Sequence, residues 1–178
     1  MRIIAGAWRG RPLQAPPGEA TRPTSDRARE ALFSMLQSRL GSFEDLAVAD
    51  LFAGTGALGL EALSRGAATC TFAETDPAAL VILRRNATAL GADDRADIRP
   101  HDATRMSGGP YHLAFLDPPY GTGLAQRALN HLARSAALAP GALVSIETAR
   151  GEILDPAGLE PLVERTFGKA VITLLRAP

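Results

Sequence analysis

The residues best suited to chemistry form a corner at positions 117–120, where Asp117, Pro118, Pro119 and Tyr120 end an apolar run. Two consecutive prolines remove two backbone donors, so neither a helix nor a strand can continue through them. Proline also holds the preceding residue in an extended conformation, which fixes the Asp117 carboxylate and the Pro118 carbonyl as acceptors. Two such acceptors can take the hydrogens of an exocyclic amino group on a nucleic acid base and release its lone pair for attack.

Two further properties of this proline corner favour chemistry on a base. The Asp117 carboxylate would offset the positive charge that develops on an attacking nitrogen. Tyr120 offers a flat surface for a base that has left its stack. The alternative is a plain turn, because two prolines often end a strand. We favour the first interpretation and predict that Asp117, Pro118 and Tyr120 are catalytic.

A second candidate site is a glycine loop, in which Gly54, Gly56 and Gly59 have the spacing G-x-G-x-x-G between a predicted strand and a predicted helix. Glycine lets a backbone approach a ligand closely, and the start of a helix offers free N–H groups. Close packing of helix on strand also selects glycine. Glu74 ends the next predicted strand, where an acid can accept both hydroxyls of a ribose. The two features together predict a cofactor that contains adenosine.

Two aspartates bear on which cofactor this is. Asp50 and Phe52 belong to the arrangement D-x-F-x-G-x-G. An acid there suits the ammonium group of S-adenosylmethionine (SAM) and would repel the pyrophosphate of NAD. We therefore expect Asp50 and Phe52 in a SAM site, although Asp50 can instead cap the following turn. Asp102 can accept a hydrogen bond from the adenine amino group or act as the N-cap of a short turn at 103–106.

The elements that position these residues alternate along the chain. After an irregular stretch of 24 residues, a helix is predicted with Thr24 as its N-cap. Buried strands and amphipathic helices then follow, with strands at 46–52, 69–74, 96–99, 111–116 and 142–148 and helices at 57–65, 77–90 and 123–137. This alternation predicts a doubly wound, mostly parallel α/β sheet with helices on both faces. The last two predicted strands, 162–167 and 170–176, flank Gly168-Lys169 and indicate an antiparallel hairpin.

The composition, with 46% hydrophobic and 21% charged residues, is typical of a globular protein. We expect residues 1–178 to form one domain. The first residues are apolar over too short a run for a signal peptide or a membrane span, so we expect a cytoplasmic protein with no membrane partner. A single cysteine, Cys70, and three scattered histidines give no cluster at metal-ligand spacing. We predict no metal site, and nothing in the sequence requires more than a monomer.

The charge is unevenly distributed although the formal net charge is zero. Residues 1–30 carry six arginines against three acids, and the rest of the chain is correspondingly acidic. A basic end on a neutral body suits an anionic macromolecule, since guanidinium groups bind phosphate well. A biased genome is the alternative, because all but one of the basic residues are arginine. We expect residues 1–45 to form a basic extension and helix for RNA contact.

Several motifs together resemble the RsmD family, which methylates guanine N2 in the 16S ribosomal RNA of the bacterial small subunit. They are "MRIIAGAWRGRPL", "TRPTSDRAREALFSML", "DLFAGTGALGLEALSRGA", "AETD" with Asn86, and "DPPY", and the resemblance runs from Met1 to about Leu124. It implies a Rossmann-like class I methyltransferase that contacts SAM through Asp50, Gly54, Gly56, Glu74 and Asp102 and catalyses through the proline corner. It also implies RNA contacts at Arg9, Arg11, Arg22 and Arg27. Ala7 departs from the family, which often has a basic residue there.

Three other functions stay open at this point. The "DPPY" motif indicates recognition of an amino group but does not identify the base. Adenine N6 methylation of RNA or DNA is therefore the nearest alternative. An NAD-dependent oxidoreductase shares the glycine loop but gives the proline corner no role. A noncatalytic RNA-binding assembly factor would use only the basic end. For the methyltransferase, the partner is small-subunit ribosomal RNA, either free or within an assembled 30S particle.

Overall fold

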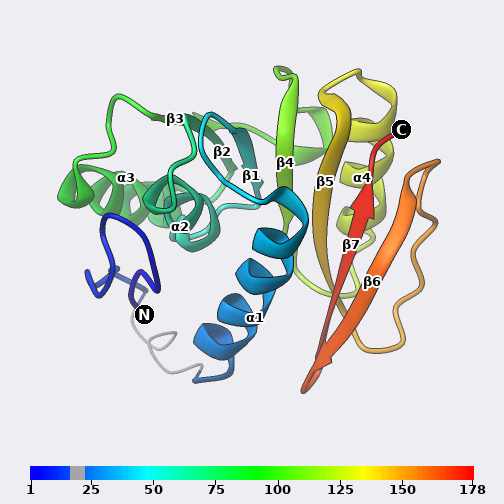
Figure 1. Ribbon diagram of the computed structural model, residues 1–178, viewed down its shortest axis with the longest axis horizontal. Coiled ribbons are helices and arrows are strands. Elements are labelled where there is room, and N and C mark those ends of the chain that lie inside the picture. Colours follow the sequence, from blue (N-terminus) through cyan, green and yellow to red (C-terminus); the bar gives the residue numbers. More distant parts are fainter. Residues whose placement is uncertain (17–22) are drawn as a thin grey trace.

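The computed structural model describes residues 1–16 and 23–178. Seven strands form one sheet in the order β3-β2-β1-β4-β5-β7-β6 (Figure 1). The strands are β1 (Ala47–Leu51), β2 (Thr69–Glu74), β3 (Ala96–Pro100), β4 (Tyr111–Leu116), β5 (Leu138–Ala149), β6 (Glu160–Phe167) and β7 (Ala170–Arg176). The helices are α1 (Pro23–Leu40), α2 (Ala57–Ser64), α3 (Pro77–Leu90), the short 3-10 helix η1 (Ala103–Arg105) and α4 (Leu124–Arg134).

The topology confirms the predicted fold. Strands β1 to β5 pair in parallel, whereas β7 runs antiparallel to both β5 and β6. Thr24 was wrong as an N-cap, because α1 begins at Pro23 and Thr24 lies inside it. Proline suits the first turn of a helix, where its missing N–H is not needed. Helix α4 ends before the predicted residue 137, since Ala136 has φ +52°, a left-handed conformation that no helix continues through.

Two hydrophobic cores cover the two faces of the sheet. Along β4, Leu113 and Phe115 pack into the core under α1, α2 and α3, and Ala114 and Leu116 pack into the core under η1 and α4. This alternation follows from the two-residue period of a strand. Helices α1 and α4 therefore lie on opposite faces (Figure 1). No helix in residues 1–16 or 23–178 is long and apolar enough to cross a membrane.

Residues 1–16, here called the N-terminal segment, fold back on themselves. The Ile3 N–H donates to the Arg11 carbonyl at 2.9 Å, and the Gly10 N–H donates to the Ile3 carbonyl at 2.9 Å. Arg2 and Pro12 form an isolated antiparallel bridge. The sequence predicts an irregular stretch here, whereas the structure shows a short looped hairpin. Ile3 and Leu13 are buried in the core under α1 to α3.

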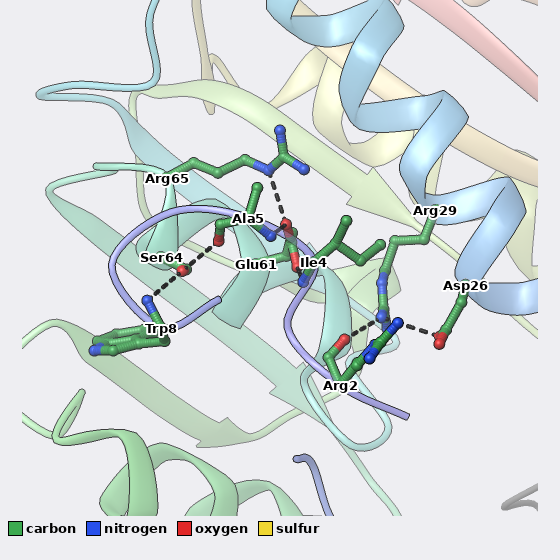
Figure 2. Close-up of polar contacts among 9 residues, drawn as sticks. All are labelled: Arg2, Ile4, Ala5, Trp8, Asp26, Arg29, Glu61, Ser64 and Arg65. Atoms are coloured by element: carbon green, nitrogen blue, oxygen red, sulfur yellow. Dashed lines mark hydrogen bonds and ion pairs between the residues drawn. The ribbon is translucent and has the colours of Figure 1, made fainter. Parts of the chain in front are cut away.

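A buried carboxylate on α2 fastens this segment to the domain. Glu61 is fully buried and accepts hydrogen bonds from the Ile4 N–H at 2.7 Å and the Ala5 N–H at 3.0 Å (Figure 2). The Arg65 Nε donates to the same carboxylate at 2.8 Å. The Arg65 guanidinium also lies 4.6 Å from the centre of the Phe33 ring on α1. Two backbone N–H groups and one guanidinium thus donate to a carboxylate that would otherwise be costly to bury.

Ser64, one turn further along α2, binds the next residues of the segment. Its hydroxyl donates to the Ala5 carbonyl at 2.6 Å and accepts from the Trp8 N–H at 3.0 Å (Figure 2). A Cβ on Gly6 would lie 1.9 Å from the Ser64 carbonyl oxygen, so only glycine allows this approach. The Ala7 N–H donates to that same carbonyl at 2.8 Å. The segment is therefore held in one conformation directly before Arg9.

Candidate active site

The predicted site residues meet at the edge where the parallel strands end. Leu51 on β1 lies opposite both Ala73 on β2 and Leu116 on β4. Glu74 and Asp117, each one residue further along its strand, therefore reach the same edge. The carboxylates are also close enough to interact, since Asp117 and Glu74 both contribute to raising the pKa of Asp50. The structure thus brings the glycine loop and the proline corner together.

The backbone of the glycine loop has the form that a ligand site needs. Gly56 has φ +82° and is the N-cap of α2, and a Cβ there would lie 2.2 Å from Leu83 Cδ1. Gly54 has φ +54°, and a Cβ there would meet nothing within 4 Å. Phe52 also has a positive φ, +70°, which is uncommon for a residue other than glycine. The loop is therefore strained into a fixed shape whose outer side, at Gly54, is open.

The third glycine of the motif serves packing. A Cβ on Gly59 would lie 2.3 Å from the Phe72 ring and 2.6 Å from the Cys70 sulfur, so α2 can approach β2 only because this residue has no side chain. Cys70 is itself buried in β2, and burial raises the pKa of its thiol well above the usual value. A protonated, enclosed thiol is a poor nucleophile. This agrees with the assignment of chemistry to the proline corner.

Asp50 lies beneath the glycine loop. Its side chain is only 1% exposed, and its Oδ2 accepts the Gly59 N–H at 2.9 Å, so the capping role considered from the sequence is present. Burial raises the pKa of Asp50 to about 8, with Asp117 and Glu74 adding to the rise and the Gly59 N–H opposing it. A cation placed beside this carboxyl would favour its ionised form. The predicted contact with SAM stays a prediction.

Glu74 connects the loop to the start of α3. Its Oε2 accepts the Gly54 N–H at 2.8 Å, and its Oε1 accepts the Thr75 N–H at 2.7 Å and the Asp76 N–H at 2.8 Å. Two carboxylate oxygens offer about four acceptor positions, so capacity for another donor is left. The backbone thus holds Glu74 against the open side of the glycine loop. A ribose contact there stays a prediction.

Asp102 is an N-cap, the alternative considered from the sequence. It precedes η1 and accepts both the Thr104 N–H and the Thr104 hydroxyl at 2.8 Å. These hydrogen bonds, followed by the nearby charges of Arg105 and Arg127, lower the pKa of Asp102. The side chain is exposed at the carboxyl edge, so an adenine contact stays a prediction.

The proline corner leaves β4 with its polar groups outward. Asp117 and Tyr120 are exposed, and Pro118 is buried. The Tyr120 hydroxyl donates to Oε1 of Glu147 on β5. Leu116 lies opposite Ile146, so Glu147 stands beside Asp117 at the same edge. Sequence reasoning missed Glu147, although it is the one acid in the otherwise apolar or neutral predicted strand 142–148 and falls near its carboxyl end.

The four arginines predicted to contact RNA differ in their surroundings. Arg9 and Arg27 are exposed. Arg11 is exposed, but its Nη2 donates to the Ala89 carbonyl near the end of α3. Arg22 lies outside the described residues. At least one of these guanidinium groups therefore has a structural partner within the protein.

Asn86 on α3 links the N-terminal segment to the glycine loop. The side chain is 2% exposed; its Nδ2 donates to the Thr55 carbonyl at 3.0 Å and to the Gln14 carbonyl at 3.1 Å. Its Oδ1 accepts the Gln14 N–H at 2.8 Å. Sequence reasoning included Asn86 only as part of a motif, with no role. The structure shows that one side chain fixes both segments.

Trp8 anchors the middle of the N-terminal segment. It is half-buried and packs against the core, and the Arg95 guanidinium lies 5.0 Å from the centre of its ring. A tryptophan engaged on one face by a cation contributes packing and a cation–π interaction. Within residues 1–16 and 23–178, no group of three or more histidines, cysteines or acids could hold a metal ion.

Comparison with known proteins supports this assignment of motifs. The family model described as Conserved hypothetical protein 95 matches residues 1–176. The chain is 40% identical over 150 residues to ribosomal RNA small subunit methyltransferase D of Escherichia coli K12, covering 83% of this chain and 74% of that protein. It is 37% identical over 175 residues to the Haemophilus influenzae protein of the same name, covering 94% and 89%.

Solved structures show the same fold. The Escherichia coli protein yhhF superposes with a TM-score of 0.87 at 36% identity, covering 99% of this chain and 97% of that one. Magnesium protoporphyrin IX methyltransferase of Synechocystis, solved with bound SAM, superposes with a TM-score of 0.70 at 14% identity, covering 87% and 80%. The second likeness concerns the fold alone and confirms the predicted class I methyltransferase architecture. The chain belongs to the Conserved hypothetical protein 95 family, which is the RsmD family that its motifs resemble.

Proposed function

We propose that this protein transfers the methyl group of SAM to the exocyclic N2 amino group of a guanine in small-subunit ribosomal RNA. The observation that carries the proposal is the meeting of the glycine loop and the proline corner at one edge of the sheet. The relatives named ribosomal RNA small subunit methyltransferase D support the choice of RNA.

The residues at this edge fit SAM. The open side of Gly54 leaves room for a ligand against the loop backbone, and Glu74 beside it has acceptor capacity for ribose hydroxyls. Asp50 supplies a carboxyl group whose ionised form a ligand ammonium would favour. Asp102 is exposed nearby for the adenine amino group, and Phe52 shapes the loop. When bound, SAM supplies a methyl group on a sulfonium ion, which an amine can accept directly.

The proline corner prepares the amine. The Asp117 carboxylate and the Pro118 carbonyl accept one amino hydrogen each, which returns the nitrogen lone pair from the ring to the nitrogen. The negative charge of Asp117 also offsets the positive charge that develops on this nitrogen. Tyr120 supports the extruded base, and its hydroxyl is held by Glu147 on the neighbouring strand. No covalent intermediate with the protein is needed, since Cys70 is buried away from this edge.

The N-terminal segment and α1 supply RNA contacts in this proposal. Arg9 and Arg27 are exposed, and residues 1–16 are fastened to α2 and α3 by Glu61, Ser64 and Asn86. Residues 1–178 then act as one methyltransferase domain whose first 45 residues face the RNA. The protein works as a monomer in the cytoplasm, where ribosomal RNA is modified.

Methyl transfer from labelled SAM to unmodified small ribosomal subunits, to protein-free small-subunit RNA and to DNA tests the proposal, with mass spectrometry of the released nucleosides. N2-methylguanosine is expected with one of the RNA substrates, and its absence with Asp117→Ala would assign the catalytic acid. N6-methyladenosine would instead support the adenine rival. Normal RNA binding and biological activity in Asp117→Ala, without any transfer by the wild type, would favour the noncatalytic assembly factor.

A further inference from the structure

A second basic surface lies on η1 and α4, on the face of the sheet opposite to the N-terminal segment. Residues 103–146 contain three arginines, Arg105, Arg127 and Arg134, and one acid, Asp117. This stretch therefore carries a net charge of 3 − 1 = +2 in a chain whose formal net charge is zero. All three arginines are exposed. Two of the three arginines are on α4, which contains no acid, and Arg105 is on η1.

The outer face of α4 is hollowed. A depression of about 470 Å³ is lined by Arg127, Asn130, His131, Arg134 and Ser135. The first four of these residues are spaced three or four apart, so they share one helix face, and all five side chains are polar. The opposite face of α4 is buried in the core under η1. The depression is thus shallow and open, and it is presented by a helix whose other face is buried.

Among residues 1–16 and 23–178, the side chains of the two arginines in the depression form no hydrogen bond or ion pair, although the charge of Arg127 helps to lower the pKa of Asp102. His131 differs, since its Nε2 donates to the Met106 carbonyl at 2.6 Å, which fixes the ring between the two guanidinium groups. A carbonyl can only accept, so the proton is on Nε2 and Nδ1 is left for solvent or a ligand.

This surface is continuous with the candidate active site. Helix α4 follows the proline corner directly, and the charge of Arg127 reaches Asp102, whose pKa it helps to lower. Arg134 lies seven positions after Arg127, which corresponds to about 10 Å along a helix axis. The surface therefore extends from the carboxyl edge of the sheet along α4.

We propose that the surface formed by Arg105, Arg127 and Arg134 binds backbone phosphates of the substrate RNA beside the target nucleotide. Guanidinium groups bind phosphate through paired hydrogen bonds, and the three exposed guanidinium groups outnumber the one adjoining carboxylate, Asp102. The inference rests on the proposed function and adds a second RNA contact, so that RNA is held from both faces of the sheet around the catalytic edge.

The test compares two double variants that each remove two positive charges. R127A/R134A removes the arginines of the hollow. R165A/R176A removes Arg165 from β6 and Arg176 from β7, both exposed on the antiparallel hairpin outside residues 1–45 and α4. Binding of protein-free small-subunit RNA and of unmodified small subunits is measured by filter retention between about 50 and 200 mM salt. SAM binding by calorimetry checks that each variant is folded.

R127A/R134A is expected to bind RNA about tenfold more weakly than the wild type, and the slope of log affinity against log salt should be smaller by roughly 1 to 2 units. R165A/R176A should keep the wild-type slope. Equal losses of RNA affinity in the two variants, or a wild-type salt slope in R127A/R134A, would overturn this inference. Neither result would overturn the proposed function. A wild type that methylates no RNA would overturn the proposed function, and one that binds no RNA would overturn both. Weaker binding of R127A/R134A to assembled subunits, together with unchanged binding to protein-free RNA, would point to a protein partner and also contradict the inference.

Discussion

The two halves of the catalytic edge are built differently. On the side of β1 and β2, Asp50 and Glu74 accept hydrogen bonds from backbone N–H groups, and Asp50 is almost completely buried. On the side of β4 and β5, Asp117 and Tyr120 are exposed at the end of a strand that two prolines terminate. The first half uses its carboxyl groups to hold a fixed loop, whereas the second leaves its polar groups exposed at the edge of the sheet. Substitutions should therefore affect stability and cofactor binding in the first half and rate in the second.

The largest effect on rate is expected from Asp117→Ala. Removing a preset acceptor and its charge should lower the methyl-transfer rate by about 10³-fold, as the loss of one electrostatic stabiliser does in other enzymes. Because Asp117 is exposed, the free energy of unfolding and SAM affinity should stay close to the wild-type values. Single-turnover transfer, thermal unfolding and calorimetry measure the three quantities. A large loss of stability in this variant would contradict the division between the halves.

Glu61→Ala, on helix α2, should act mainly on the free energy of unfolding. It removes a fully buried carboxylate and leaves Arg65 and two backbone donors of the N-terminal segment without their partner. Breaking a buried ion pair from one side costs about 3–5 kcal/mol in free energy of unfolding. Denaturant unfolding measures the loss, and Glu30→Ala, at an exposed position of α1, is the matched control. An unchanged free energy of unfolding would show that Glu61 does not fasten the segment.

The buried Asp50 predicts a pH dependence of stability. Its folded pKa of about 8 lies above the ordinary value of 3.8, so between these values the folded state holds a proton that the unfolded state has lost. The contribution of Asp50 to stability is therefore fully present below about pH 3.8, falls as pH rises through this window and levels off above about pH 8. Thermal unfolding of the ligand-free protein across this range should show the fall, and Asp50→Asn should reduce it.

The same group sharpens the assignment of the SAM ammonium. If a cation binds beside Asp50, binding below about pH 8 must release the proton, so SAM affinity should rise with pH by up to about tenfold per unit and then become constant. Calorimetry in buffers of different ionisation enthalpy detects the released proton directly. Proton release that persists in Asp50→Asn would assign the titration to another group.

The smallest effect is expected from Tyr120→Phe. The variant keeps the aromatic ring and loses the hydroxyl that donates to Glu147. A hydrogen bond of this kind contributes about 0.5–1.5 kcal/mol, so the rate should fall roughly 2- to 12-fold. Tyr120→Ala, which also removes the stacking surface, should be slower than Tyr120→Phe. Equal rates for the two variants would mean that the ring does not support the base.

The sequence by itself determined the parts of the molecule that depend on local pattern. Strand and helix periodicity located the elements to within a few residues, and the positions of glycine and proline marked the loop and the corner where the backbone departs from regular structure. Asp50 and Asp102 show the limit of such patterns. At both positions a capping role and a cofactor role were open, and the structure shows the capping hydrogen bonds. Capping and ligand binding use the same short acidic side chain at the same kind of turn.

Only the tertiary structure decided which distant residues become neighbours. Glu61 and Ile4 are 57 residues apart, Tyr120 and Glu147 are 27 apart, and neither pair leaves a local pattern in the sequence. The arginines divide in the same way, since Arg11 proved to have an internal carbonyl partner while Arg127 and Arg134 line an outward hollow. A side chain's type states which interactions it can form. Which partner a side chain contacts is decided by the folded structure, because the free energy of packing depends on residues from all parts of the chain.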